Sequence, residues 1–231
     1  MRKIIISSLA AAALMGWALP ASAQLVSNPS FEDPALGNGA LWQDSIPGWT
    51  GTVDGVNNFG EFHNTANIVA KDGANVAFIN SAAGLPQGLV QTIGVVAAGE
   101  RYDASAWFGW RSDNANIAHV ALELWVDGVV DGGNISGGTK VASNAPVMVQ
   151  GSWVEGVVNY TVPPAHAGKA LRIRLATNSP LGSQTNFDHV SMTKATPTPV
   201  PTLTGWALIV LCFLFAGVAS PLIVRLGRQE A

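Results

Sequence analysis

The sequence predicts an all-β fold, an antiparallel β-sandwich of the jelly-roll type, for the central part of the chain. Several stretches alternate apolar and polar residues with a period of two, which is typical of half-buried strands. Gly, Asp, Asn and Pro turn signals separate these stretches, and long runs of strong helix formers are absent. Roughly eight strands joined by irregular loops fit a sandwich better than any helical or α/β fold.

The clearest alternation occurs in residues 102–110, 119–126 and 171–178. The apolar faces that this pattern predicts are Tyr102, Ala104, Ala106, Phe108 and Trp110; Val120, Leu122, Leu124 and Val126; and Leu171, Ile173 and Leu175. Asp127-Gly128 follows the second stretch directly and predicts a two-residue hairpin. Weaker strand patterns occur at residues 75–80, 88–96, 153–162 and 187–193.

A long loop is expected between Asp33 and Asn67. It contains Trp42, Trp49, Phe59 and His63. Loops of this length are uncommon unless they bind a ligand or cover a core.

Residues 1–23 have the layout of a secretory signal peptide. Arg2 and Lys3 give a positive start, residues 4–19 are mostly apolar, and Ala21-Ser22-Ala23 supplies the small residues that signal peptidase needs. The apolar stretch is short for a first membrane helix. We therefore expect the mature chain to begin at Gln24.

The C-terminus contains a linker, an apolar segment and a basic tail. Residues 195–205 are rich in Pro and Thr, and residues 206–224 carry no charge. As a helix the apolar segment would be about 28 Å long, which is enough to cross a bilayer core. Arg225 and Arg228 in the tail, residues 225–231, predict that the tail is cytoplasmic and the body is outside.

The sequence "VPTLTGW" (Val200–Trp206) resembles the IPTL variant of the C-terminal sorting signals that exosortases process. Val replaces the usual Ile, and Thr204-Gly205 replaces Ser-Glu. The resemblance implies that the processing enzyme recognises Pro201, Thr202, Leu203 and Trp206, with Arg225 and Arg228 closing the signal. It also implies a precursor held at the inner membrane and a product at the surface or in the extracellular matrix of a Gram-negative bacterium. A permanent single-pass anchor is the alternative.

The composition of the body, residues 24–194, limits its structure and partners. This length suits one domain. Residues 24–205 contain eight Lys and Arg against fourteen Asp and Glu, a net charge of about −6, which argues against nucleic-acid partners. The only cysteine is Cys212, in the apolar segment, so the body has neither a disulfide nor a cysteine zinc site.

The order of several short motifs resembles the galactose-binding-like jelly rolls, which include carbohydrate-binding modules. These motifs are "LVSNPSFEDP", "IPGWT", "AKDGANVAFIN", "LVQTIGVVAAGERYDASAW" and "NFDHVSM". Glu32 and Asp188 lie on the first and last strand patterns, which often pair. The resemblance implies that these two carboxylates hold a structural Ca²⁺, an ion that prefers oxygen ligands. The alternative is a pair of surface carboxylates beside turns.

A sugar site would combine a flat aromatic face with polar groups for hydroxyls. The candidates on the non-core strand faces or strand ends are Trp107, Arg111, Glu123, Trp125, Arg172 and Arg174. If one concave sheet gathers them, they form a cleft for an extracellular polysaccharide. The alternative is structural, with the tryptophans covered by a loop and Glu123 paired with Arg172 or Arg174.

No catalytic constellation stands out in the sequence. The four histidines lack close metal spacing, and neither G-x-S-x-G nor H-E-x-x-H occurs. The sequence therefore favours a non-enzymatic exported protein that binds polysaccharide. A membrane-anchored structural or adhesive domain without sugar specificity is the alternative, and a glycan-active enzyme is a third hypothesis.

Overall fold

The computed structural model describes residues 23–37, 42–52, 58–80, 86–116, 119–178 and 182–195. By contacts the chain divides into Met1–Thr196 and Pro197–Ala231, and every described residue belongs to the first unit. Residues 1–22 of the proposed signal peptide, the apolar segment and the sorting residues Pro201, Thr202, Leu203, Trp206, Arg225 and Arg228 lie outside the described residues. Within the described part, no helix has the length and apolar character needed to span a membrane.

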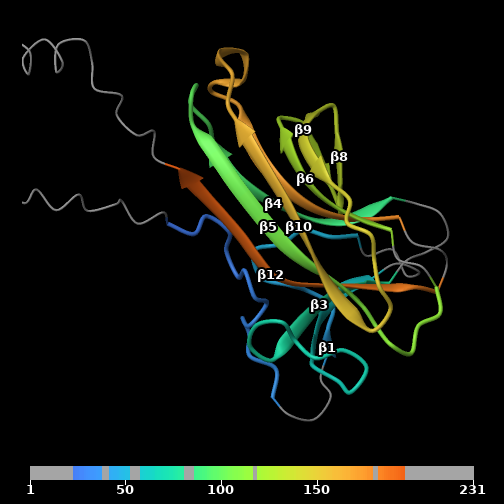
Figure 1. Cartoon of the computed structure of the whole chain (residues 1–231). Helices are drawn as coiled ribbons and strands as arrows, with labels where there is room; N and C mark the ends of the chain where they lie inside the picture. The colour runs from blue at the N-terminus through green and yellow to red at the C-terminus, as the bar shows by residue number, and fades with distance from the viewer. Residues whose placement is uncertain are drawn as a thin grey trace, which may run out of the picture. The chain divides into compact units, whose positions relative to one another are not determined.

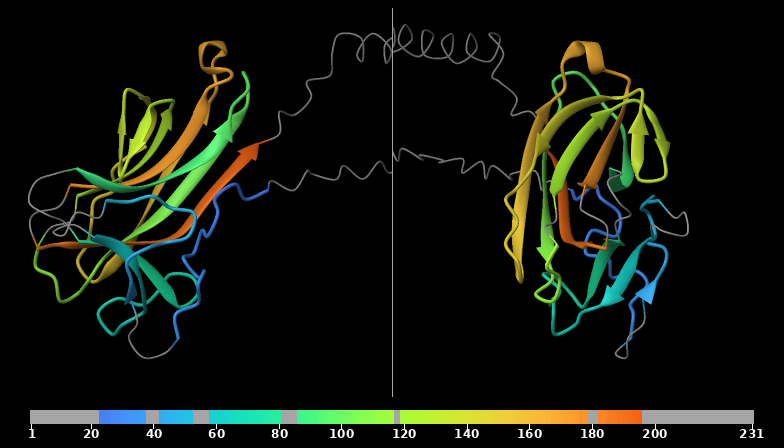
Figure 2. Two further views of the ribbon diagram at one scale, coloured as in Figure 1. Left: turned by 180° about the vertical axis from the view of Figure 1, so that it is seen from behind. Right: turned by 90° about the vertical axis from the view of Figure 1, so that its right-hand side faces the viewer.

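The described part is built almost entirely of antiparallel strands (Figure 1). One sheet has the order β1 (Trp42–Gln43), β2 (Asn58–His63), β3 (Asn75–Asn80), β12 (Gln184–Ala195), β5 (Arg101–Trp110) and β10 (Ser152–Thr161). The other has the order β4 (Gln87–Val95), β11 (Ala170–Thr177), β6 (Val120–Val126) and β9 (Thr139–Asn144). A small hairpin, β7 (Val129–Asp131) and β8 (Asn134–Ser136), and a 3₁₀ turn at Pro164–His166 complete the structure. The predicted antiparallel sandwich is confirmed, and Figure 2 shows its two layers from two further directions.

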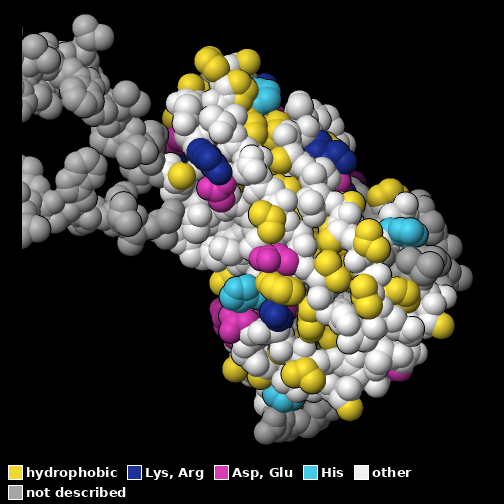
Figure 3. Space-filling view, viewed as in Figure 1, with side chains coloured by type: hydrophobic (Ala, Val, Ile, Leu, Met, Phe, Trp, Pro, Cys, Tyr) yellow, Lys and Arg dark blue, Asp and Glu magenta, His cyan; other side chains and the backbone are white. Residues whose placement is uncertain are grey.

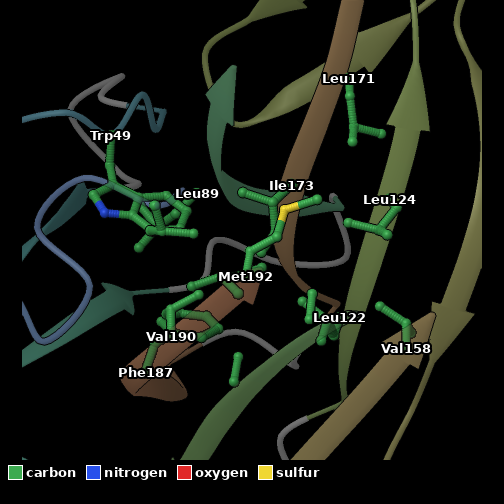
Figure 4. Close-up of a cluster of buried hydrophobic side chains, with 14 of the residues drawn as sticks. Trp49, Leu89, Leu122, Leu124, Val158, Leu171, Ile173, Phe187, Val190 and Met192 are labelled. Atoms are coloured by element: carbon green, nitrogen blue, oxygen red, sulfur yellow. The ribbon is translucent and has the colours of Figure 1, made fainter. Parts of the chain in front are cut away.

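The core lies between the two sheets, and the alternation in the sequence decides which side chains enter it. Leu122, Leu124, Leu171 and Ile173 project from the four-stranded sheet and are fully buried. Figure 4 shows them packing with Val158, Phe187 and Met192 of the six-stranded sheet. Burying each large aliphatic side chain contributes about 1.5–3 kcal/mol, so this core can hold the body together without a disulfide.

The hairpin predicted at Asp127-Gly128 is wrong in its pairing. Both residues have positive φ, +59° and +90°, as a tight turn requires. The turn connects β6 to β7, but β6 pairs with β9 and β11, and β7 pairs with β8. The chain therefore leaves the sheet at this turn and forms a separate hairpin before returning to the edge as β9.

The long loop expected between Asp33 and Asn67 contains two strands, β1 and β2. The sequence "NFGEFH" of β2 does not show the simple alternation of a half-buried strand, because a loop covers its outer face and the core covers its inner face. Phe59 and Phe62 are both buried, on opposite faces. Trp49 is packed in the core against Phe31.

The first residues of the body run along the last strand, as expected from the sequence. The Leu25 N–H donates to the Met192 carbonyl at 2.8 Å, and the Val190 N–H donates to the Pro29 carbonyl at 2.8 Å. This arrangement brings Glu32 and Asp188 to the same end of the six-stranded sheet, beside residues 71–75.

Candidate functional site

A second apolar cluster lies on the outer face of the six-stranded sheet. It consists of Phe62, Val76 and Phe78 from β2 and β3, with Ile68 from the loop that follows β2. The Phe62 and Phe78 rings have centroids 5.8 Å apart and are tilted by 49°. An apolar outer face of this kind needs a cover, and the Ile68 loop supplies it over part of the cluster.

The uncovered part of this cluster forms the floor of a hollow of about 390 Å³. Its lining residues are Trp42, Phe62, His63, Thr65, Phe78, Asn80, Arg111 and Gln184. Trp42, at the edge of the sheet, is 59% exposed, which makes its ring available to a ligand. We call this feature the Trp42 hollow. Three aromatic side chains line it together with amide and guanidinium groups.

The polar lining of the Trp42 hollow is a row of planar groups joined by hydrogen bonds. The Gln184 amide nitrogen donates to Asn80 Oδ1 at 3.0 Å, and Arg111 Nη1 donates to Gln184 Oε1 at 3.1 Å. Arg111 also donates from Nε and Nη2 to the two oxygens of Asp113, at 2.8 and 2.6 Å. This pairing lowers the pKa of Asp113 and raises that of Arg111, so both groups stay charged.

The six residues predicted to bind sugar do not meet in one cleft. Trp107 lies on the outer face of the six-stranded sheet, and Arg111 follows the same strand. Glu123, Trp125, Arg172 and Arg174 lie on the outer face of the four-stranded sheet. Their strands belong to different layers of the sandwich, and only Arg111 lines the Trp42 hollow.

The Trp107 ring is already covered by a cation. The Lys71 ammonium lies 3.7 Å from the ring centroid. A cation–π contact of this geometry occupies the face on which a sugar ring would stack. Figure 3 shows charged and histidine side chains gathered with apolar ones on the face that carries β5, β10 and β12.

Glu123 and Arg174 form a buried ion pair under the β7–β8 hairpin. Arg174 Nη1 lies 2.9 Å from Glu123 Oε2, and Arg174 also donates to the Gly133 carbonyl and to Asn134 Oδ1. Burial alone would raise the pKa of Glu123, but hydrogen bonds from Lys140, Trp125 and Arg174 outweigh it and lower the pKa. Arg172 donates to the Asp127 carbonyl. These contacts match the alternative given in the sequence analysis, in which Glu123 pairs with an arginine of the neighbouring strand and the pair has a structural role.

The sequence did not single out Trp42, Phe62, Phe78, Asn80 or Gln184 as ligand-binding residues. One signal was present in "NVAFIN", which is apolar on both faces of its strand. Val76 and Phe78 face outward, while Ala77 and Ile79 face the core. A strand that is apolar on both faces indicates that another part of the chain covers its outer face. A groove is then expected at the place where this covering segment ends.

Glu32 and Asp188 bind the same loop. Glu32 Oε1 accepts N–H donors from Ala74 and Asn75 at 2.7 and 2.6 Å. Asp188 Oδ2 accepts from Lys71 and Asp72 at 2.5 and 3.0 Å, and burial raises the pKa of Asp188 to about 6.

The donor set of this pair suits Ca²⁺ in chemistry, because both side chains offer hard carboxylate oxygens. The described residues contain no group of three or more His, Cys, Asp or Glu side chains arranged to hold a metal ion. Backbone carbonyls or water would have to complete the roughly six to eight ligands that Ca²⁺ takes.

Comparison with known proteins gives two family matches. Residues 22–193 match the HpiC1-like family model, described as HpiC1 cyclase. Residues 198–222 match the model of the IPTL-CTERM motif, which confirms the sorting signal inferred from the sequence. Among curated proteins, none matches the chain.

Solved structures share the fold at low sequence identity. Fisc, a Stig cyclase from Fischerella sp. TAU in complex with (3Z)-3-(1-methyl-2-pyrrolidinylidene)-3H-indole, is 21% identical, with a TM-score of 0.61 over 75% of this chain and 98% of that chain. A second cyclase structure from Fischerella sp. TAU is 22% identical, with a TM-score of 0.62 over 78% of this chain and 100% of that chain. The CBM22-2 xylan-binding domain of Paenibacillus barcinonensis Xyn10C is 17% identical, with a TM-score of 0.47 over 73% of this chain and 98% of that chain. A likeness as loose as the last says nothing of a ligand for this chain.

Proposed function

The chain belongs to the HpiC1-like family, and we propose that this member is an exported, non-enzymatic protein whose Trp42 hollow binds polysaccharide. The IPTL-CTERM motif supports export and a membrane-held precursor. The proposal places the processed protein at the cell surface or in the extracellular matrix.

The residues that line the Trp42 hollow are the main support for this proposal. Sugar rings have apolar faces that stack on aromatic rings and equatorial hydroxyls that pair with planar amide and guanidinium groups. The hollow offers both: the rings of Trp42, Phe62 and Phe78, and the planar polar groups of Asn80, Arg111 and Gln184. Trp42 is the most exposed of the three aromatic rings.

The lining of the hollow favours binding over catalysis. Glycoside hydrolysis generally uses two carboxyl groups on opposite sides of the scissile bond. The described residues that line the hollow include no Asp or Glu, and Arg111 already pairs with Asp113.

A direct binding measurement tests the proposal. The exported protein, purified from cells that express the full chain, is titrated calorimetrically with soluble polysaccharides. Trp42→Ala should weaken binding at least about fivefold, since one aromatic stacking contact is worth about 1–3 kcal/mol and about 1.4 kcal/mol corresponds to tenfold. Trp107→Ala is the matched control, because it removes a tryptophan from the same sheet face whose ring Lys71 already covers. If Trp107→Ala abolishes binding and Trp42→Ala does not, the site is wrong.

A second candidate function is cyclase-type chemistry on an aromatic substrate. Its support is the family match, together with a structural neighbour, Fisc, that is in complex with an indole compound. Flat aromatic ligands would also stack on Trp42, with His63 as the proton donor or acceptor. Binding of an indole compound by a protein that binds no polysaccharide would favour this candidate.

The sorting part of the proposal concerns an exosortase-type enzyme. We propose that it cuts near Val200–Trp206 and releases the body from the inner membrane. Immunoblots of cell fractions should show a shortened protein outside that membrane, and full-length protein retained there in a Leu203→Ala variant. Full-length wild-type protein in the inner membrane at steady state would instead support a permanent anchor.

A structural Ca²⁺ between Glu32, Asp188 and the loop at residues 71–75 is also proposed. It would tie the two ends of the body together in a protein that has no disulfide. Gly73 supports a tight fit of this loop, because its φ is +68° and a Cβ there would lie 2.3 Å from Glu32 Oε1.

A further inference from the structure

We propose that the Trp42 hollow is one half of a longer groove, and that its ligand is a neutral oligosaccharide chain rather than a single sugar or an acidic glycan. This inference rests on the proposed function and adds the length and charge of the ligand. It depends on how the hollow continues and on the charges that line it.

A second, polar hollow adjoins the Trp42 hollow. This second hollow has a volume of about 280 Å³ and is lined by Arg111, Asp113, Asn114, Ala115, Gly182 and Gln184. Arg111 and Gln184 line both hollows. A ligand that contacts these two residues from the Trp42 side therefore meets the second hollow when it is extended by another ring.

The two hollows differ in character. The first has an aromatic floor, which suits stacking. The second has mostly amide, carboxylate and backbone groups, which suit hydroxyls. A chain of sugars could stack one ring on Trp42 and place the hydroxyls of a following ring against Asn114 and Gly182.

The groups that would contact such a chain are fixed before it binds. The hydrogen-bonded row from Asn80 through Gln184 and Arg111 to Asp113 ends at Asn67, whose amide donates to Asp113 Oδ2 at 2.7 Å. Trp110 Nε1 donates to the Asn114 carbonyl at 2.8 Å and so fixes the position of Asn114, which lines the second hollow. Pre-positioned groups reduce the ordering cost of binding, so each added ring that reaches this row should increase affinity.

The charges in the groove cancel. Arg111 is the only Lys or Arg and Asp113 the only Asp or Glu among the described residues that line either hollow. They form a bidentate pair, and the lowered pKa of Asp113 keeps it ionised. A uronic acid would have to approach Asp113 to reach Arg111, so like-charge repulsion disfavours an acidic ligand.

The experiment is a calorimetric titration of the exported full-chain protein with two ladders of oligosaccharides, from a single ring to a hexasaccharide. One ladder is neutral, and the other has the same backbone with uronic acid units. We expect affinity for the neutral ladder to rise at least about tenfold between one ring and three, and the acidic ladder to bind more weakly. Asp113→Asn frees the Arg111 charge and should reverse the preference in favour of the acidic ladder.

Asp103→Asn is the matched control. Asp103 pairs with Arg101 two residues before it on β5, at the same sequence spacing as Asp113 and Arg111, but Asp103 lines neither hollow. This variant should bind both ladders as the wild type does.

Three outcomes would overturn the inference or its premise. Equal affinity for one ring and for six shows that the second hollow is not used, although the proposed function would stand. Tighter binding of the acidic ladder by the wild type refutes the neutral class. Binding of neither ladder refutes the proposed function itself.

Discussion

The carboxylate of Glu123 and the guanidinium of Arg174 form an ion pair 2.9 Å long, with both side chains less than a tenth exposed. Arg174 uses its other donors on the Gly133 and Gln87 carbonyls and on Asn134 Oδ1. The pair therefore ties β6 and β11 to the β7–β8 hairpin that covers them. Its role in this arrangement is to hold the hairpin.

The first prediction concerns this pair. Arg174→Ala leaves the Glu123 carboxylate buried with less compensation, and breaking buried pairs of this kind usually costs about 3–5 kcal/mol. We expect a loss of that size in the free energy of unfolding, measured by urea denaturation. Polysaccharide binding in the Trp42 hollow should not change in protein that remains folded.

A control separates the pair from simple loss of packing. The double variant Glu123→Leu/Arg174→Leu removes both charges and should be more stable than Arg174→Ala, because no unpaired charge remains buried. A loss below about 1 kcal/mol in Arg174→Ala would mean that solvent reaches the pair.

The second prediction concerns pH. Glu61 is fully buried, accepts a hydrogen bond from Gln43 at 2.6 Å, and has Glu32 and Asp33 nearby. Burial, with a smaller contribution from those two charges, raises its pKa from 4.5 to about 8. The folded state thus keeps a proton that the unfolded state has lost, so stability should fall as pH rises from about 4.5 to about 8.

Glu61→Gln should remove the part of this dependence that lies above about pH 6, since Asp188, whose pKa burial raises to about 6, contributes only below that pH. The variant cannot ionise, so at pH near 8 its free energy of unfolding should exceed that of the wild type, by a few kcal/mol at most. Glu155→Gln, an exposed glutamate on β10, is the control. Both are compared by denaturation across the pH range with a calcium chelator present. A wild-type profile that rises from pH 5 to 8 while Glu61→Gln is flat contradicts the assignment.

The third prediction concerns calcium. If Glu32 and Asp188 hold Ca²⁺, the ion binds only the folded state and should raise the melting temperature, with a stabilisation that grows as the logarithm of the Ca²⁺ concentration once this exceeds the dissociation constant. Chelation should lower the melting temperature of the wild type. In Asp188→Asn the melting temperature should no longer respond to Ca²⁺, and an unchanged response in that variant would exclude the site.

The sequence was sufficient for the fold class but not for every strand connection or for the candidate site, and the reason is physical. Alternation reports which side of a strand is buried, so Leu122, Leu124, Leu171 and Ile173 were assigned correctly to the core. It does not report which strands belong to the same sheet, and so which outward-facing side chains share one surface. Trp107 and Trp125 both alternate outward, yet they belong to different layers.

The residues of the Trp42 hollow were not predicted from the sequence for a related reason. Phe62 and Phe78 look like core residues in the sequence, and they are buried. Their burial comes from the Ile68 loop on the outer face, which only the tertiary structure reveals. Trp42 lies on a strand of two residues, too short for any periodicity to predict.

The last prediction concerns Gly60, which controls where Trp42 lies. A Cβ at Gly60 would lie 1.9 Å from the Gln43 carbonyl oxygen, a backbone atom of β1. Because β1 is a two-residue edge strand, Gly60→Ala should displace it rather than unfold the sheet, and Trp42 would move away from Phe62, its partner in the strand register. We expect polysaccharide affinity to fall about tenfold with a loss of only about 1–2 kcal/mol in the free energy of unfolding. Gly37→Ala is the control, since a Cβ there meets nothing within 4 Å. Wild-type affinity in Gly60→Ala would show that the position of β1 does not matter to the ligand, and that stacking on Trp42 is not what binds it.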